Sequence, residues 1–241
     1  VASGSGATVS SNSWGSAVYG EYTGDAAEFD ALVRDARPAA GDQPMTFFFS
    51  AGNEGETSPG GLGTMGAPAC GKNVISVGAA ENCDADGFDG CGVPPDGADS
   101  IIDVIAFSSR GPCADGRMAP TIVATGTHVA GIASTAPGYD GSGVCDQYWP
   151  GGQTLYARSS GTSHSCPLAA GAGALFQEYR RNVTGALPSP ALTKAALVAA
   201  ARDIRGGSDG HGGTIAPVPG PVQGWGTLSM EDLLNDEGDL P

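Results

Sequence analysis

Residues 158–181, RSSGTSHSCPLAAGAGALFQEYRR, pass from a polar glycine turn into a long helical pattern. We predict a helix over 163–181, with Pro167 in its first turn, where proline is tolerated. Its many alanine and glycine residues let other backbone segments pack closely, so we expect this helix to be central and buried. Ser163 stands at its N-terminus, where free N–H groups and the helix dipole favour negative charge. The position suits a nucleophile, although an N-cap is the commoner role of such a serine.

Outside this helix, apolar strand patterns alternate with helical patterns. We predict strands within 7–15, 45–53, 73–80, 103–109, 121–125 and 155–161, and helices over 25–36, 190–204 and 229–236. The apolar run MTFFF, which opens segment 45–53, is typical of a buried parallel strand. The alternation predicts an α/β fold with a mostly parallel sheet. No internal repeat or interdomain linker is visible, so we treat residues 1–241 as one domain with a frayed acidic tail at 236–241.

The composition excludes some classes of partner and favours one compartment. The chain has 11 basic and 26 acidic residues, a net charge of −15, so it would repel the phosphate backbone of a nucleic acid. No apolar run is long enough to span a bilayer, so we expect no membrane partner. Charged residues make up 15% of the chain, below the about 25% of an average domain. With few lysines and many serines, threonines and glycines, this composition favours a secreted or extracellular protein.

The chain carries six cysteines, Cys70, Cys83, Cys91, Cys113, Cys145 and Cys166, an even number that suits disulfides. Cys83 and Cys91 flank a short polar loop and are the favoured pair. A bridge between Cys113 and Cys145 is a second candidate, and Cys70 and Cys166 are then left over. The alternative is that some are free thiols in a reducing compartment. The spacing CxxC does not occur, so the cysteines give no sign of a zinc site.

Several motifs, in order along the chain, resemble those of the subtilisin-like serine proteases, the subtilases. GTSHSCPLAAG (161–171) resembles the family's nucleophile motif, G-T-S-M-A-x-P. SSNSWG (10–15) resembles its substrate-binding strand, FFFSAGNEG (47–55) its oxyanion-asparagine segment, FSSRGPCADGRMAPTIVATGT (107–127) its F-S-S-R-G-P stretch and GWGTLSMEDLL (224–234) its closing segment. The resemblance covers nearly the whole chain. The pattern is most similar to the oxidant-stable alkaline subtilases that carry a C-terminal β-barrel.

The resemblance implies a subtilisin-like three-layer α/β fold and an activity. Ser163 would attack the peptide carbonyl and form an acyl-enzyme, while the Asn53 amide and the backbone N–H of Ser163 would stabilise the oxyanion. Taken alone, Asn53 would more often be an ordinary turn residue in AGNEG. A polypeptide substrate would add as an extended strand beside 10–15. The residues implied to bind substrate are Asn12, Ser13, Trp14, Gly15, Ala51, Gly52, Ala67, Pro68 and Thr162, around a pocket for large apolar side chains. By the same resemblance, the Ala67–Pro68 bond is expected to be cis.

The general base is harder to find. The string GTHVAG around His128 is similar to the family's H-G-T-H-V-A-G, but the base there is the first histidine, and Thr125 holds that position. His128 also follows Asn53, whereas the family order is Asp, His, Asn, Ser. His164 comes directly after the nucleophile, and neighbouring helix residues diverge by about 100°, so it is poorly placed to accept the serine proton. His211 lies in a glycine-rich loop and is expected to be solvated.

The family's catalytic aspartate strand has no match either. We therefore expect residues 1–241 to be the C-terminal part of a catalytic domain whose Asp and His lie upstream or in a processed partner chain. The isolated chain should then be inactive or nearly so, and the N-terminal remainder of the domain would be a partner. The alternative is a catalytically dead subtilase that acts as a binding or scaffold module. An unrelated hydrolase with G-x-S-x-G is disfavoured, because Ser165 stands at the fifth position.

No cofactor is needed for this chemistry, and we assign no metal ligand. The segment DADGFD (84–89) alternates carboxylates, which suits a hard cation such as calcium. Phe88 stands at the fifth place, however, and no glutamate closes the loop, so an acidic disulfide-closed turn is the favoured interpretation. The resemblance to subtilases makes a structural calcium ion elsewhere in the chain an expectation as well.

Overall fold

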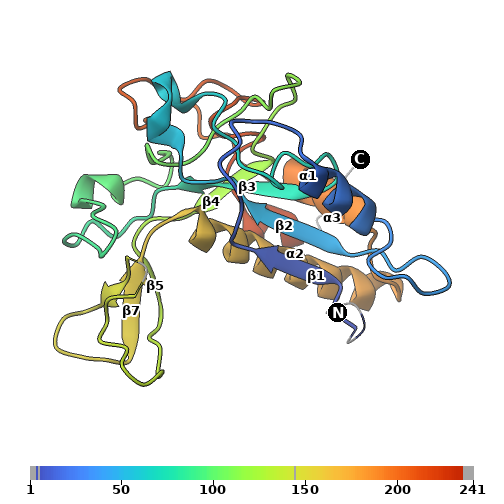
Figure 1. Ribbon diagram of the computed structural model, residues 1–241, viewed down its shortest axis with the longest axis horizontal. Helices are drawn as coiled ribbons and strands as arrows, with labels where there is room; N and C mark the ends of the chain where they lie inside the picture. Colours follow the sequence, from blue (N-terminus) through green and yellow to red (C-terminus); the bar gives the residue numbers. More distant parts are fainter. Residues whose placement is uncertain (1–3, 5, 144, 236–241) are drawn as a thin grey trace.

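The computed structural model describes residue 4 and residues 6–143 and 145–235. Its centre is a parallel four-stranded sheet in the order β1-β2-β3-β4 (Figure 1). These strands are β1 (Val9–Asn12), β2 (Thr46–Ser50), β3 (Ile75–Ala80) and β4 (Ile122–Thr125). All three pairings are parallel, so the carboxyl ends of the four strands meet at one edge of the sheet. The predicted α/β fold is confirmed.

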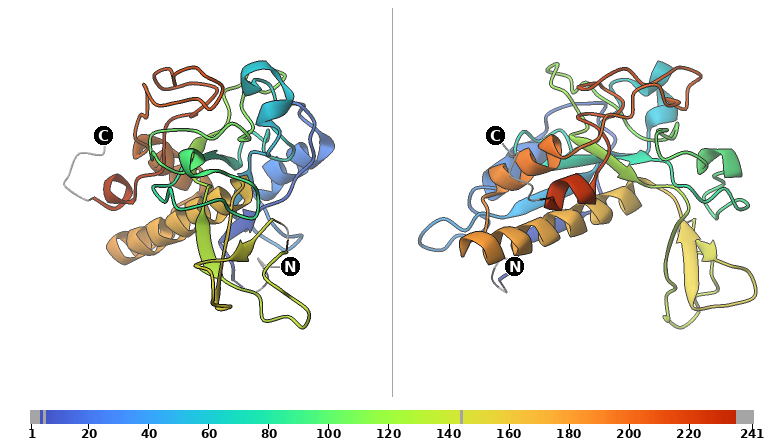
Figure 2. Two further views of the ribbon diagram at one scale, coloured as in Figure 1. Left: turned by 90° about the vertical axis from the view of Figure 1, so that its left-hand side faces the viewer. Right: turned by 180° about the vertical axis from the view of Figure 1, so that it is seen from behind.

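Helices cover both faces of the sheet. One face packs against α2 (Thr162–Thr184), α3 (Pro190–Ala199) and α4 (Met230–Leu234), the gold, orange and red helices in the right panel of Figure 2. The other face packs against α1 (Gly24–Leu32). Strand β2 shows why the sheet is buried on both sides, because successive side chains point to opposite faces. Phe48 joins the cluster with α2, whereas Phe47 and Phe49 join the cluster with α1.

Helix α2 is the central helix that the sequence predicts, and it runs three residues further. It contacts all four strands of the parallel sheet. A Cβ placed on Gly173 would lie 2.6 Å from the ring of Phe48, so glycine is what allows the helix to pack this close to β2. The helix ends at Gly185, whose φ of 78° is the left-handed conformation of a typical C-cap.

Other predictions differ from the structure in detail. Segment 103–109 is not a strand: it forms only an isolated bridge from Val104 to Ala80, and its backbone groups bond instead to loops, as Gly55 N does to Phe107 O. The helix predicted over 190–204 ends at Ala199, and that over 229–236 covers only α4. The tail at 236–241 lies outside the described residues. Short 3-10 turns among the described residues include η2 (Gly55–Thr57), η3 (Pro59–Gly61) and η4 (Pro95–Gly97).

A small antiparallel sheet, of which only the last strand is predicted, projects from the body (Figure 1, lower left). It consists of β5 (Val129–Ile132), β6 (Gln147–Tyr148) and β7 (Tyr156–Ser159) in the order β5-β7-β6. Strand β7 leads directly into the turn that precedes α2. In the described part of the chain, no helix combines the length and the apolar character needed to cross a bilayer.

The disulfides differ from the favoured pairs. Cys70 joins Cys113, and Cys91 joins Cys145, while Cys83 and Cys166 are free. The predicted Cys83–Cys91 bridge is wrong because Cys91 is turned toward β7, where it meets Cys145.

The interpretation of 84–89 as a disulfide-closed turn is also wrong, because Cys83 is free and Cys91 is bonded to Cys145. The loop encloses the fully buried guanidinium of Arg158, which donates to the carbonyl oxygens of Asp86 at 2.7 Å and Phe88 at 3.0 Å. The same guanidinium lies 3.5 Å from a carboxylate oxygen of Asp84 and stacks on Trp149 at 3.7 Å from the ring centroid. The guanidinium of Arg158 thus supplies a positive charge inside this acidic loop.

Candidate active site

A small cleft lies where β1 and β2 end and α2 begins. Its volume is about 180 Å³, and its walls are Ser13, Trp14, Gly15, Ser16, Ser50, Gly52, Asn53, Glu54, Gly66, Thr162 and Ser163. Open α/β sheets commonly hold their ligands outside the carboxyl ends of the strands. The topology therefore brings together two segments that the sequence singles out, the end of β2 with Asn53 and the start of α2 with Ser163.

The backbone of Ser163 is fixed from two sides, and its hydroxyl is free. Gly161, with φ of 145°, makes the turn into α2, and its N–H donates to Gly126 O at 2.7 Å. Ser13 Oγ donates to Ser163 O at 2.7 Å across the cleft. Among the described residues, nothing hydrogen-bonds to the Ser163 hydroxyl, which borders the cleft. The serine is therefore held as an accessible group at the N-terminus of a long helix.

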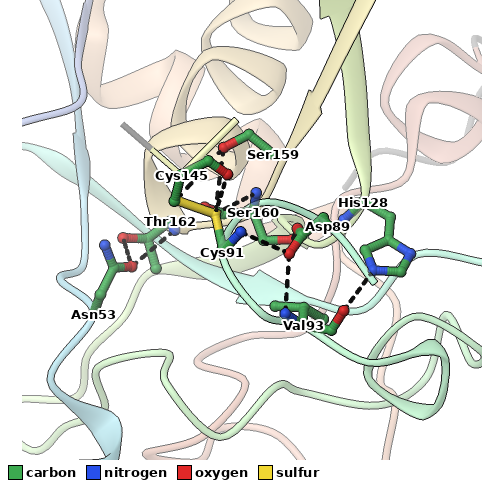
Figure 3. The surroundings of a disulfide bond; sticks show 9 residues. All are labelled: Asn53, Asp89, Cys91, Val93, His128, Cys145, Ser159, Ser160 and Thr162. Atoms are coloured by element: carbon green, nitrogen blue, oxygen red, sulfur yellow. Dashed lines mark hydrogen bonds between the residues drawn. A yellow bond between two sulfur atoms is a disulfide. The ribbon is translucent and has the colours of Figure 1, made fainter. Parts of the chain in front are cut away.

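Asn53 is oriented by Thr162. Its Oδ1 accepts from Thr162 N at 3.0 Å and from Thr162 Oγ1 at 2.9 Å (Figure 3). With the oxygen engaged, the Nδ2 group is left to donate, and no described residue accepts from it. A Cβ on Gly161 would lie 3.8 Å from Nδ2, so the amide adjoins the turn before Ser163. Thr162 itself is only 1% exposed and acts on Asn53.

The remaining predicted substrate-binding residues divide into two groups. Ser13, Trp14, Gly15 and Gly52 line the cleft, while Asn12, Ala51, Ala67 and Pro68 do not. Asn12 Nδ2 donates to Phe48 O at 3.0 Å, and Ala51 is buried. Ala67 lies directly behind two residues that line the cleft, Gly15 and Ser16. Ser16 N donates to Ala67 O at 2.9 Å, and a Cβ on Gly15 would lie 2.7 Å from that oxygen. The Ala67–Pro68 bond is cis, as the resemblance implies.

Sequence reasoning misses four residues of the cleft: Ser16, Ser50, Glu54 and Gly66. Glu54 matters most, because it gives a carboxylate to a pocket expected to be apolar. Its Oε2 accepts from Ser109 Oγ at 3.1 Å, which holds the side chain in place. Its position directly after Asn53 is the one signal that could have identified it.

The three histidines lie in three different settings. His128 is 1% exposed, with Nδ1 at 2.6 Å from Asp84 O and Nε2 at 3.1 Å from Val93 O. Burial lowers the pKa of His164 below its ordinary value, and Asp89 and Asp146 oppose that shift. His211 is exposed, with Nε2 at 3.2 Å from Ala106 O. Within the described residues, no histidine ring hydrogen-bonds to Ser163.

Hydrogen bonds and a disulfide, which we call the brace, hold the segment just before the turn into α2. Ser160 Oγ donates to the buried Asp89 carboxylate and accepts from His128 N at 2.9 Å (Figure 3). Ser160 N donates to Cys91 Sγ at 3.2 Å, and Cys91 is joined to Cys145. The brace fixes the segment from which Gly161 and Ser163 follow.

Comparisons with known proteins identify the family of the chain. Residues 2–226 match the model of the subtilase family. The serine protease/ABC transporter B family protein tagD of Dictyostelium discoideum is 29% identical over 153 residues, 54% of this chain and 8% of that protein. The serine protease AprX of Bacillus subtilis (strain 168) is 31% identical over 160 residues, 64% of this chain and 30% of AprX. The chain thus spans less than a third of these curated relatives.

Two solved structures show the same fold at low identity. The prenylagaramide maturation protease PagA has a TM-score of 0.59 at 20% identity, over 97% of this chain and 62% of that chain. The patellamide maturation protease PatA has a TM-score of 0.58 at 19% identity, over 97% of this chain and 64% of that chain. The family match covers most of the sequence, and the fold agrees with it: the chain belongs to the subtilase family of serine proteases.

Proposed function

We propose that this chain supplies the nucleophile and the oxyanion-binding groups of a serine endopeptidase. The observation that carries the proposal is the shared cleft of Ser163 and Asn53, with Asn53 Oδ1 held by Thr162 so that Nδ2 is free to donate. Ser163 Oγ would attack the peptide carbonyl and form an acyl-enzyme. The developing oxyanion would receive hydrogen bonds from Asn53 Nδ2 and from Ser163 N–H, since the first N–H groups of a helix lack intrahelical partners.

In this proposal, the catalytic general base (His) and its acidic partner (Asp) come from residues outside the 241-residue chain. Among the described residues, no histidine ring hydrogen-bonds to Ser163, and the surface offers places for further structure. Strand β1 lies at the edge of the sheet, so one side of its backbone is unpaired by the described residues. Helix α2 exposes Leu168 by 44% and Leu175 by 50%. A further parallel strand beside β1 and a helix beside α2, from the remainder of the domain, would cover both.

The proposed substrate is an extended polypeptide whose strand lies along the segment after β1. Trp14 is 51% exposed at the rim of the cleft, where an apolar side chain can pack. Glu54 adds a negative charge to the same cleft, so we propose that a long side chain with a basic end is accepted as well as an apolar one. We also propose an extracellular setting, which the two disulfides support.

The test is covalent labelling of Ser163. The full-length gene product and the 241-residue chain are each treated with a fluorophosphonate probe and assayed on a quenched peptide library. We expect the full-length protein to be labelled and active and Ser163→Ala to abolish both, while Ser142→Ala, at an exposed serine, changes neither. The 241-residue chain should show no turnover above its Ser163→Ala variant.

Two results would overturn parts of the proposal. Turnover by the 241-residue chain that Ser163→Ala removes would refute the requirement for an external base. A full-length protein that is neither labelled nor active would refute the enzyme and leave the catalytically dead subtilase, a binding or scaffold module, in its place.

A further inference from the structure

The two disulfides of the described chain differ in their exposure to solvent. Cys70 and Cys113 are 0% and 2% exposed and belong to the apolar cluster between the sheet and α1. In the other disulfide, Cys145 is exposed and Cys91 is half-buried. Reduction of a disulfide requires that a thiolate reach one of its sulfur atoms. A dissolved thiol can therefore attack the Cys91–Cys145 bond in the folded protein, whereas the Cys70–Cys113 bond is shielded by the core.

The exposed disulfide is also the one that lies beside the turn into α2. Ser160 N donates to Cys91 Sγ at 3.2 Å, and Ser160 is followed directly by Gly161, the N-cap of α2. Figure 3 shows the disulfide next to Ser159 and Ser160. The redox state of this bond therefore bears on the segment that positions Ser163.

The surroundings of the Cys91 sulfur suit the reduced form. The sulfur lies 3.0 Å from Cys145 O and 3.2 Å from Ser160 O. A disulfide sulfur carries no proton, so it cannot donate to either carbonyl oxygen. A Cys91 thiol can donate to one of them and can still accept from Ser160 N. Reduction thus adds a hydrogen bond that the oxidised form lacks, and a disulfide whose reduced form is stabilised is easier to reduce.

We propose that the Cys91–Cys145 disulfide is a reversible redox switch on the turn into α2, operated by a dithiol reductant. A thiolate of the reductant attacks the exposed Cys145 Sγ, and the bond between the two protein sulfurs breaks. Its electron pair leaves on Cys91 Sγ, where the Ser160 N–H stabilises the thiolate. The Asp89 carboxylate, which accepts from Cys91 N at 3.0 Å, opposes a negative sulfur, so Cys91 takes up a proton and remains as a thiol.

The second thiol of the reductant completes the reaction. It attacks the mixed disulfide, the Cys145 sulfur leaves and is protonated, and the reductant departs as its own disulfide. The two protons that the reductant loses balance the two that the protein thiols gain. An oxidised dithiol drives the same steps in reverse, so the bond can form again when the medium becomes oxidising.

The switch changes one part of the molecule and leaves the core unchanged. In a medium rich in dithiols the brace loses its disulfide, while the Cys70–Cys113 bond continues to hold the cluster beneath α1. In an oxidising medium the brace is complete, and Ser163 follows from a fixed segment. The effect on catalysis rests on the proposed function, whereas the selective reduction and the local opening do not.

The chemical test uses the 241-residue chain with Cys83→Ala, because the exposed free thiol of Cys83 could itself exchange with a disulfide. The chain is equilibrated with graded ratios of reduced to oxidised dithiothreitol. Free thiols are trapped by alkylation in acid-quenched samples, and each cysteine is identified by peptide mass spectrometry. Hydrogen exchange of residues 159–162 is measured on the same samples, and the Cys70–Cys113 bond is the internal control.

We expect Cys91–Cys145 to open at a ratio of reduced to oxidised reagent at least about ten-fold lower than the ratio that opens Cys70–Cys113. In the selectively reduced chain, residues 159–162 should exchange about five-fold faster, and reoxidation should reverse this change. Two results would overturn the proposal: opening of both bonds at the same ratio, or selective reduction that leaves exchange of 159–162 unchanged.

The consequence for catalysis is tested on the full-length protein. Its kcat should fall as Cys91–Cys145 opens and recover on reoxidation, while the double variant C91A/C145A should not respond to the dithiol. A response of the double variant equal to that of the unmodified protein would refute the assignment to this disulfide. A full-length protein without activity in either redox state would refute the proposed function, and the thiol and exchange measurements would still decide whether the switch exists.

Discussion

Removing the Cys91–Cys145 disulfide should increase local opening of residues 159–162, before Ser163, by more than the loss of global stability alone would cause. The double variant C91A/C145A opens a loop with a sequence separation of 54, and the control C70A/C113A opens one of 43. Loop-closure entropy in the unfolded chain assigns about 4 kcal/mol to each bridge, with a difference of only about 0.2 kcal/mol. The control should lose somewhat more stability, because both of its sulfur atoms are buried.

The two double variants should differ in how easily residues 159–162 open locally. Of the two bridges, only Cys91–Cys145 touches the turn: Ser160 N donates to Cys91 Sγ at 3.2 Å, and Cys145 Sγ lies 3.9 Å from Ser160 O. Loss of one such bond is worth about 1 kcal/mol, or about five-fold in the opening equilibrium of the segment. Urea unfolding measures the global free energy of each variant, and hydrogen exchange measures the opening of residues 159–162. In C91A/C145A we expect the amides of residues 159–162 to exchange about five-fold faster than the loss of global stability of that variant explains.

The control makes this prediction refutable. In C70A/C113A, exchange at 159–162 should change no more than the global free energy of unfolding requires. If both variants accelerate exchange of the segment by the same factor after that correction, the disulfide does not brace the turn. The argument from the Ser160–Cys91 contact would then fail.

Three further predictions concern single side chains. In the active full-length protein, Asn53→Ala should lower kcat about 10²–10³-fold with little change in KM; this magnitude is that of subtilisin's own oxyanion asparagine, and unchanged kcat would exclude the assigned role. Glu54→Gln should lower kcat/KM about three- to ten-fold for substrates with lysine before the scissile bond and leave methionine substrates nearly unaffected, as competing peptides would show. Burial lowers the pKa of Lys194 from 10.5 to about 8, so the unfolded chain binds more protons between these values and stability should rise with pH across that window. Urea unfolding should show this rise, at most about 3 kcal/mol, and Lys194→Met should remove it.

Local sequence patterns were sufficient for the central part of the fold. The helical run from Ser163 and the apolar run at 45–53 each show a clear pattern of apolar residues and a clear start. Both can be recognised without knowledge of any distant contact. Ser163 and Asn53 could be singled out as a pair because their motifs are local as well. Their meeting in one cleft follows from parallel topology, which places the ends of β2 and the start of α2 at the same edge of the sheet.

Features decided by distant partners could not be predicted in this way. Segment 103–109 has the apolar character of a strand, but its backbone bonds to the loop after β2, as in the bond from Ser109 N to Gly52 O. The choice of Cys145 as partner of Cys91 depends on the loop that wraps around Arg158, a residue 67 positions away from Cys91 in the sequence. The carboxylate of Glu54, which lines the cleft, is held by Ser109 Oγ, a residue 55 positions away.

The Arg158 guanidinium makes part of this protein independent of its medium. It is attached covalently, is always charged, and cannot be extracted by a chelator or diluted away. The loop 84–89 that surrounds it therefore keeps its counter-charge in any buffer.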